Sequence, residues 1–117
     1  MTLRATYRLQ LRGGFDLDDV AELADYLAHL GVSHAYCSPI LRAVRDSTHG
    51  YDVVDPQAID PALGGEAAYT RMTAALRDLG LGQLLDIVPN HMATDADNAW
   101  WWDVLENGPS SRFASFF

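Results

Sequence analysis

The sequence is poor in positive charge and in cysteine. Eight Lys and Arg stand against 16 Asp and Glu among 117 residues, so the formal net charge is −8. Because a chain this acidic repels nucleic-acid phosphates and anionic membrane surfaces, we expect neither as a partner. Cys37 is the single cysteine, which excludes a disulfide within the chain and favours a reducing compartment.

Long apolar runs and several common motifs are also missing. No stretch approaches the roughly 18 apolar residues that cross a membrane, and the first residues lack the apolar segment of a signal peptide. We therefore expect a cytoplasmic protein. The patterns CxxC, GxxxxGK(S/T), GxGxxG and HExxH are absent, which removes zinc-finger, P-loop, dinucleotide-binding and zinc-protease interpretations. No cofactor is expected.

What is present is the alternating pattern of strands and helices. Residues 5–11 alternate apolar and polar side chains as a strand does, and residues 32–37 are a second short apolar run. Between them, apolar residues recur at helical spacing from Asp16, a candidate N-cap, to Leu30, and Gly31 follows as a stop. This order predicts a β-α-β unit.

The pattern then repeats after an interruption. Residues 38–66 contain so many prolines and glycines that we expect a long irregular loop, while 67–79 regain helical spacing and 82–88 form a third strand. Right-handed crossovers then give a parallel sheet with its site residues just beyond the strand ends. The predicted fold class is α/β. Three strands make either an open sheet or part of a (β/α)8 barrel, which needs about 250 residues.

Polar side chains that suit sugar hydroxyls follow the third predicted strand. Asp86 accepts hydrogen bonds, the imidazole of His91 donates one, and the amide of Asn90 does both. Asn90 could instead offer its carbonyl oxygen to calcium. The structural alternative is that Asp86 pairs with a cation of the barrel, Asn90 makes a turn and His91 caps a helix.

A second polar group lies in the long loop. Gly50 allows a tight turn that brings Tyr51 forward, so that its ring could stack on a sugar, and Asp52 could pair with an arginine or accept hydroxyl hydrogen bonds. His49 adjoins this turn and is a further binding candidate. The structural alternative is a tyrosine packed under the loop, with Asp52 in a turn.

Three consecutive tryptophans follow Asn98. Asn98 is a candidate N-cap for a short helix that ends at Gly108. Because neighbouring helical side chains point about 100° apart, at most two of Trp100, Trp101 and Trp102 can enter one core. Plain packing is the simplest interpretation, and sugar stacking or a docking face are the alternatives.

The motif DIVPNH at residues 86–91 resembles the first sequence signature of the α-amylase family of glycoside hydrolases. Within that family, the maltooligosyltrehalose synthases have segments similar to ATYRLQL at 5–11, STHGYDVVDP at 47–56, LGGE at 63–66 and WWWDVLENG at 100–108.

The resemblance implies that residues 1–117 are the N-terminal part of a (β/α)8 barrel, up to the start of the insert after its third strand. The implied reaction is an intramolecular transglycosylation that converts the reducing-end α-1,4 bond of a maltooligosaccharide into an α,α-1,1 bond. His91 would hydrogen-bond the sugar, Tyr51 would stack on it, Asp52 would shape the same subsite and Asp86 would brace it. Asn90 would bind metal only in a calcium-dependent relative.

In the family that this chain resembles, the nucleophile and the acid/base follow later strands, beyond Phe117. We therefore expect the isolated chain to be an inactive fragment, since a retaining mechanism needs two carboxyl groups about 5–5.5 Å apart. Another hydrolase or glucanotransferase of the family, and a non-catalytic carbohydrate-binding module, stay open as alternatives. Unpaired strand edges would also favour self-association.

Overall fold

A computed structural model describes residues 2–117, in which a three-stranded parallel sheet organises most of the chain. β1 (Thr6–Leu9), β2 (His34–Cys37) and β5 (Gly82–Leu85) lie in the order β1-β2-β5. The register sets Arg8 opposite Tyr36, and Tyr36 opposite Leu84. The predicted α/β class and all three strands are confirmed, although each strand is shorter than its apolar pattern suggested.

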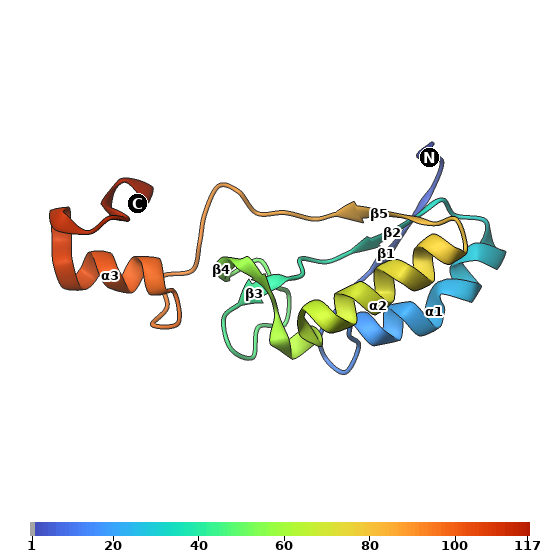
Figure 1. The fold of residues 1–117 in the computed structure, drawn as a ribbon, viewed down its shortest axis with the longest axis horizontal. Coiled ribbons are helices and arrows are strands. Elements are labelled where there is room, and N and C mark those ends of the chain that lie inside the picture. The colour runs from blue at the N-terminus through green and yellow to red at the C-terminus, as the bar shows by residue number, and fades with distance from the viewer. Residues whose placement is uncertain (1) are drawn as a thin grey trace.

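Two helices pack against each other and cover one face of this sheet (Figure 1). α1 spans Leu17–Leu30 and α2 spans Gly65–Asp78. Asp16 caps α1 by accepting from the backbone N–H of Asp19, and the Asp19 carboxylate accepts from the N–H of Asp16 in return. The predicted N-cap is therefore confirmed. No helix formed by residues 2–117 is long and apolar enough to cross a membrane.

The core fills the space between the helices and the sheet. Its largest fully buried apolar side chains are Leu11, Leu17, Val20, Leu27, Leu63, Met72 and Leu76. Tyr7 lies on the helix side, where its ring packs edge-on against Tyr26 of α1. Because side chains alternate along a strand, Arg8 lies on the opposite face. That face therefore presents Arg8, Tyr36 and Leu84, of which Leu84 is 38% exposed.

The expectation of an irregular loop over 38–66 is wrong. This stretch forms an antiparallel hairpin of β3 (Leu41–Ala43) and β4 (Val53–Ile59), followed by a short 3₁₀ turn, η1 (Pro61–Leu63). The pairing passes from Arg42 with Asp55 to Leu41 with Ile59, so Pro56 falls in an irregularity of the ladder. A proline at a bulge forfeits no ladder hydrogen bond, which is why a strand survives there.

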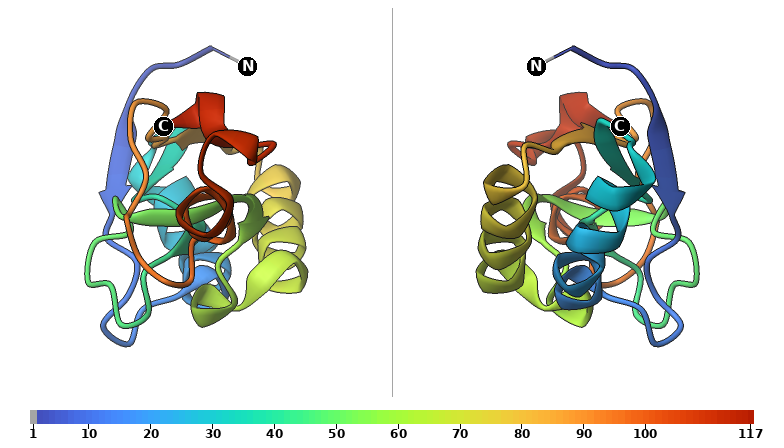
Figure 2. Two further views of the ribbon diagram at one scale, coloured as in Figure 1. Left: turned by 90° about the vertical axis from the view of Figure 1, so that its left-hand side faces the viewer. Right: turned by 90° about the vertical axis from the view of Figure 1, so that its right-hand side faces the viewer.

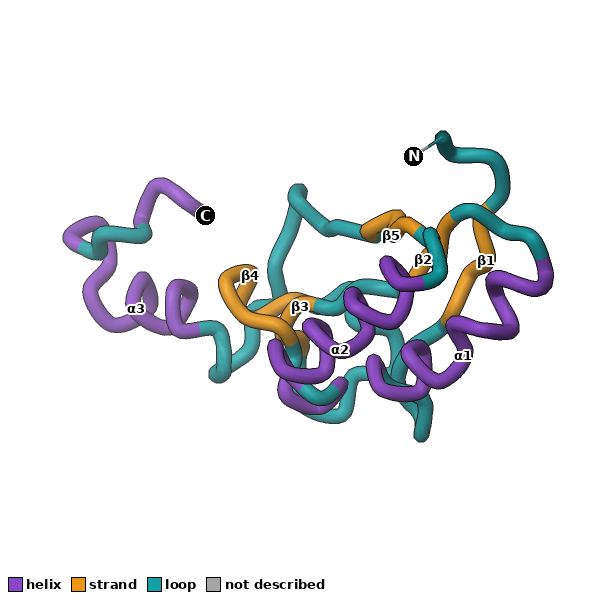
Figure 3. The backbone as a smooth tube through the Cα atoms, turned by 45° about the vertical axis from the view of Figure 1, so that its right-hand side comes forward, coloured by secondary structure: helices purple, strands orange, loops and turns teal. Residues whose placement is uncertain are grey.

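The C-terminal segment stands away from the sheet (Figures 1 and 3). α3 (Ala99–Asn107) is followed by two 3₁₀ turns, η2 (Gly108–Ser110) and η3 (Ala114–Phe116). The Cα radius of gyration is 16.4 Å, whereas a compact chain of this length has about 13–14 Å. Figure 2 shows the molecule along its longest axis, which is horizontal in Figure 1. α3 lies in front of the sheet in one view and behind it in the other.

The tryptophans diverge as predicted. The side-chain oxygen of Asn98 accepts from two backbone N–H groups at 3.1 Å and caps α3. Trp100 stacks on Phe113, Trp101 meets Phe117, and Trp102 is 47% exposed with its Nε1–H donated to Glu106. Two indoles therefore pack within the C-terminal segment while the third faces solvent.

Candidate functional site

Three side chains from distant parts of the chain meet at the carboxyl end of the parallel sheet. Arg8 Nη1 donates to Asp86 Oδ2 at 2.9 Å, and Arg8 Nη2 donates to the Tyr51 hydroxyl at 2.8 Å. The Tyr51 hydroxyl donates to the same Asp86 oxygen at 2.5 Å. The three groups thus form a closed ring of hydrogen bonds, in which the Arg8 guanidinium donates to both the Asp86 carboxylate and the Tyr51 phenol.

Each member reaches this point for a simple structural reason. Arg8 is held in β1, Asp86 is the first residue after β5, and Tyr51 lies in the turn between β3 and β4. Parallel strands bring their carboxyl ends to one edge of a sheet, and the hairpin returns the turn to the same edge. The Arg8 guanidinium lies 4.5 Å from the centre of the Tyr36 ring, a cation–π contact that fixes its plane.

The network perturbs the ionisation of Tyr51. The hydrogen bond to Asp86 raises the pKa of Tyr51, desolvation adds to this, and the contact with Arg8 opposes it. The phenol therefore keeps its proton well into the alkaline range and acts as the donor toward Asp86. Asp86 is the more sheltered partner of the ion pair, because its side chain is 16% exposed and that of Arg8 is 35% exposed.

His91 joins the site through the backbone of Tyr51. Its Nε2 lies 3.1 Å from the Tyr51 carbonyl oxygen and therefore donates to it, while Nδ1 lies 2.7 Å from Oδ1 of Asn90. Both Asn90 and His91 are exposed, in an irregular segment after β5. The helix-capping alternative for His91 is wrong, since the next helix begins at Ala99.

Asp52 and His49 bond within the turn itself. Ser47 Oγ donates to Asp52 at 2.6 Å, and His49 Nε2 lies 3.8 Å from the other Asp52 oxygen. The backbone N–H of Tyr51 donates to His49 Nδ1 at 3.0 Å, and the two rings are stacked with centroids 6.0 Å apart. The turn is thus organised by its own side chains, which set the direction of Tyr51.

Comparison with known proteins now decides the family. The sequence model of the α-amylase catalytic domain matches residues 9–117. The chain belongs to the α-amylase family. It is 52% identical, over 97% of its length, to a putative maltooligosyl trehalose synthase of Mycobacterium tuberculosis, of which it covers 16%. It is 36% identical, over 89% of its length, to the intracellular maltogenic amylase of Bacillus subtilis, of which it covers 17%.

Solved structures agree with this family assignment. The chain superposes on maltooligosyltrehalose synthase from Arthrobacter ramosus with a TM-score of 0.92 and 43% identity, over 96% of this chain and 15% of that one. The hypothetical maltooligosyl trehalose synthase of Sulfolobus tokodaii gives a TM-score of 0.91 and 46% identity, over 97% and 16%. The chain therefore spans about a sixth of the length of the relatives it matches, as part of an α-amylase-type (β/α)8 barrel.

A cavity of about 620 Å³ adjoins His91 in this α-amylase-family chain. Its walls are mostly apolar and come from the hairpin, the segment after β5 and the C-terminal aromatics: Leu41, Val53, Pro56, Val88, Pro89, Asn90, His91, Met92, Trp100, Phe116 and Phe117. An apolar hollow with polar groups at its edge is typical of sites that bind small organic ligands.

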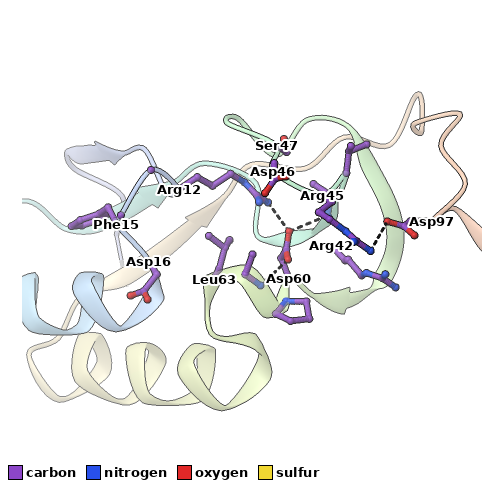
Figure 4. Close-up of a pocket in the computed structure, with 16 residues that line it drawn as sticks. Arg12, Phe15, Asp16, Arg42, Arg45, Asp46, Ser47, Asp60, Leu63 and Asp97 are labelled. Carbon is purple, nitrogen blue, oxygen red and sulfur yellow. Dashed lines mark hydrogen bonds and ion pairs between the residues drawn. The ribbon is translucent and has the colours of Figure 1, made fainter.

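A second cavity, of about 460 Å³, lies under the hairpin beside the glycine turn that precedes α1 (Figure 4). Its centre is a buried ion pair, in which Arg12 Nη2 donates to Asp60 at 2.9 Å and both side chains are at most 7% exposed. Arg45 and Asp97 approach each other at its rim. None of the Arg8, Tyr51 and Asp86 side chains lines this cavity, which is therefore separate from that network.

Of the residues singled out from the sequence, the structure brings Tyr51, Asp86 and His91 together. The structural alternative for Asp86 is also confirmed, because its partner is a cation of the barrel, Arg8. Sequence reasoning missed Arg8 as a site residue. The signal was present: in a strand that alternates, a charged residue flanked by Tyr7 and Leu9 must face away from the helices.

Metal binding by Asn90 stays an expectation for calcium-dependent relatives alone. Within residues 2–117, no group of three or more His, Cys, Asp or Glu side chains gathers in an arrangement that could hold a metal ion. Asn90 itself contacts His91 through its side-chain oxygen, the atom that a calcium ion would use.

Proposed function

We propose that this chain supplies part of the sugar-binding end of a barrel that acts on maltooligosaccharides, in the manner of a maltooligosyltrehalose synthase. The reaction is an intramolecular transglycosylation, in which the reducing-end α-1,4 bond becomes an α,α-1,1 bond. The observation that carries this proposal is the network of Arg8, Tyr51 and Asp86, with His91 beside it, at the carboxyl end of the sheet. The 52% identity to a putative synthase supports the choice of reaction.

Each side chain has a distinct task in this proposal. The ring of Tyr51 offers an apolar face to the apolar side of a glucosyl unit, as aromatic rings do in sugar-binding sites. His91 is exposed and contacts the backbone carbonyl of Tyr51, and we propose that its imidazole binds a hydroxyl of the same sugar. Asp86 holds Tyr51 through its hydroxyl, and Asp52 holds the turn through Ser47. Asp52 and His49 therefore shape the subsite from behind.

We further propose that residues 1–117 alone do not break a glycosidic bond. Retention of configuration requires a nucleophile and an acid/base about 5–5.5 Å apart. Asp86 already accepts at Oδ2 from both Arg8 and Tyr51, which makes this carboxylate a poor nucleophile. Bond cleavage then falls to carboxylates from other barrel strands.

A hydrolase or glucanotransferase of the same family is the second candidate. It is favoured by the 36% identity to the intracellular maltogenic amylase of Bacillus subtilis. The two candidates share a sugar-binding site and differ in the acceptor of the glycosyl group, which is the substrate's own anomeric hydroxyl in the synthase and water in the hydrolase.

A chimeric enzyme tests the proposal. This chain replaces the superposable segment of the Arthrobacter ramosus synthase, and the product is incubated with maltopentaose. We expect a non-reducing product that carries a trehalose end. In the chimera, Tyr51→Ala should abolish most of this activity, whereas Tyr26→Ala, which removes a half-exposed tyrosine from α1, should not. Glucose or maltose as the main product would favour the hydrolase instead.

The isolated chain provides the complementary measurement. Titration with maltopentaose, followed by amide chemical shifts, should perturb residues around Tyr51 and His91, without formation of any product. A folded chimera without activity, together with sugar binding by the isolated chain, would identify a non-catalytic binding module. Absence of binding in both proteins would refute the proposed site.

A further inference from the structure

We propose that Arg8 is the positioning residue of this site, and that it directs the ring of Tyr51, rather than its hydroxyl, toward a bound sugar. This inference rests on the proposed function for the identity of the ligand. Its first test, however, needs no ligand and therefore succeeds or fails independently.

Arg8 is the member of the network that the fold holds in place. It sits in β1, paired in register with Tyr36 of β2, and its guanidinium lies over the Tyr36 ring. Tyr51 and Asp86 both lie outside regular strands, in the hairpin turn and in the segment after β5. Two irregular segments are therefore fixed relative to each other by a side chain from a third, paired segment.

The contacts of Arg8 use two different nitrogens. Nη1 donates to Asp86 and Nη2 donates to Tyr51, at 2.9 and 2.8 Å. A planar guanidinium presents these donors in a fixed fork, whereas a lysine ammonium is a point charge on a flexible stem. Lysine would keep the charge but lose the geometry that joins Tyr51 to Asp86.

The network leaves little of Tyr51 for a ligand except one ring face. Its hydroxyl donates to Asp86 and accepts from Arg8, so its proton and an acceptor site are both engaged. The ring of His49 lies beside that of Tyr51, nearly parallel to it at 19° with the centroids 6.0 Å apart. The opposite ring face is then the surface presented to a sugar, and His49 acts as its backing.

The test is a titration of Tyr51 in the chain with carbon-13-labelled tyrosine. Comparison with Tyr51→Phe assigns its signal among the five tyrosines. In Arg8→Met we expect the Tyr51 midpoint to fall from its raised value toward the ordinary value of about 10, because Tyr51 parts from Asp86. Arg8→Lys should give the same fall, although the charge is kept.

The sign of the change separates the alternatives. If Arg8 were only a neighbouring charge, its removal would leave the bond to Asp86 intact and the Tyr51 midpoint would rise further, which would overturn the proposal. An unchanged midpoint would also overturn it. Arg71→Met is the matched control, since Arg71 forms an exposed ion pair with Asp18 far from Tyr51, and it should leave the midpoint unaltered.

Ligand binding provides the second readout. Arg8→Lys should weaken maltopentaose binding by about tenfold through loss of preorganisation, and Arg71→Met should not weaken it. Should Arg8→Met fail to fold by circular dichroism, Arg8→Lys decides both measurements. A fall in the Tyr51 midpoint without sugar binding in any variant would confirm the positioning role and refute the proposed function.

Discussion

Two of the arginine–aspartate pairs, Arg12–Asp60 and Arg71–Asp18, should differ greatly in their effect on stability, although their contact distances are alike. Asp60 lies 2.9 Å from Arg12, and Asp18 lies 2.8 and 2.9 Å from Arg71. The side chains of the first pair are 7% and 6% exposed, whereas those of the second are 45% and 59% exposed. Burial, rather than distance, therefore distinguishes the two ion pairs.

Asp60→Ala should destabilise the fold by about 4 kcal/mol, within the range of roughly 3–5 kcal/mol for a buried pair that loses one partner. The change leaves Arg12 buried with an uncompensated charge, and its Nε already has no hydrogen-bond partner. It also removes the acceptor for the backbone N–H groups of Ala43 and Ala62. Asp18→Ala, by contrast, should leave stability almost unchanged because solvent screens that pair.

Urea denaturation followed by far-ultraviolet circular dichroism measures the stability of both variants, because the signal reports the unfolding of α1 and α2. With a slope of about 1–2 kcal/mol per molar urea, the loss in Asp60→Ala shifts the midpoint down by about 2–4 M. Small domains have only about 5–15 kcal/mol of stability. If Asp60→Ala does not fold, Asp60→Asn takes its place, because it keeps an acceptor and its midpoint should fall between those of Asp60→Ala and Asp18→Ala. Equal midpoints for Asp60→Ala and Asp18→Ala would refute the reasoning.

Two further predictions concern the turn and the core. Gly50→Ala should destabilise the chain more than Gly14→Ala, because both glycines have positive φ but only at Gly50 would a Cβ meet Pro39 O, at 2.9 Å; equal urea midpoints would contradict this. Burial raises the pKa of Cys37 to about 11, so the thiol stays protonated in the fold. The protonated thiol stabilises the fold fully below the ordinary thiol pKa. This stabilisation is lost as pH rises from about 9 to 11, which lowers the free energy of unfolding by roughly 2–3 kcal/mol. In Cys37→Ala the free energy of unfolding should fall less over this pH range than in the unsubstituted chain. An equal fall in both proteins would contradict the prediction.

Local signals in the sequence predicted the elements whose stability is decided locally. Asp16 and Asn98 cap helices because a short acceptor before a helical pattern satisfies free N–H groups whatever surrounds it. The hairpin of β3 and β4 was missed because Pro56 and the neighbouring glycines read as breakers. Only the pairing of the two strands shows that the proline falls in an irregularity of the ladder.

The candidate site likewise has features that the sequence predicts and others that only the tertiary structure determines. The sequence by itself predicted Tyr51, Asp86 and His91 as sugar-binding residues, since they follow strands and belong to recognisable motifs. It also determined that the chain is α/β, because hydrophobic periodicity is a local property. Only the tertiary structure decided that Arg8 joins Tyr51 to Asp86, and that Asp52 and His49 bond within their own turn. These contacts span up to 78 residues of sequence, and they depend on strand register, which no local pattern encodes.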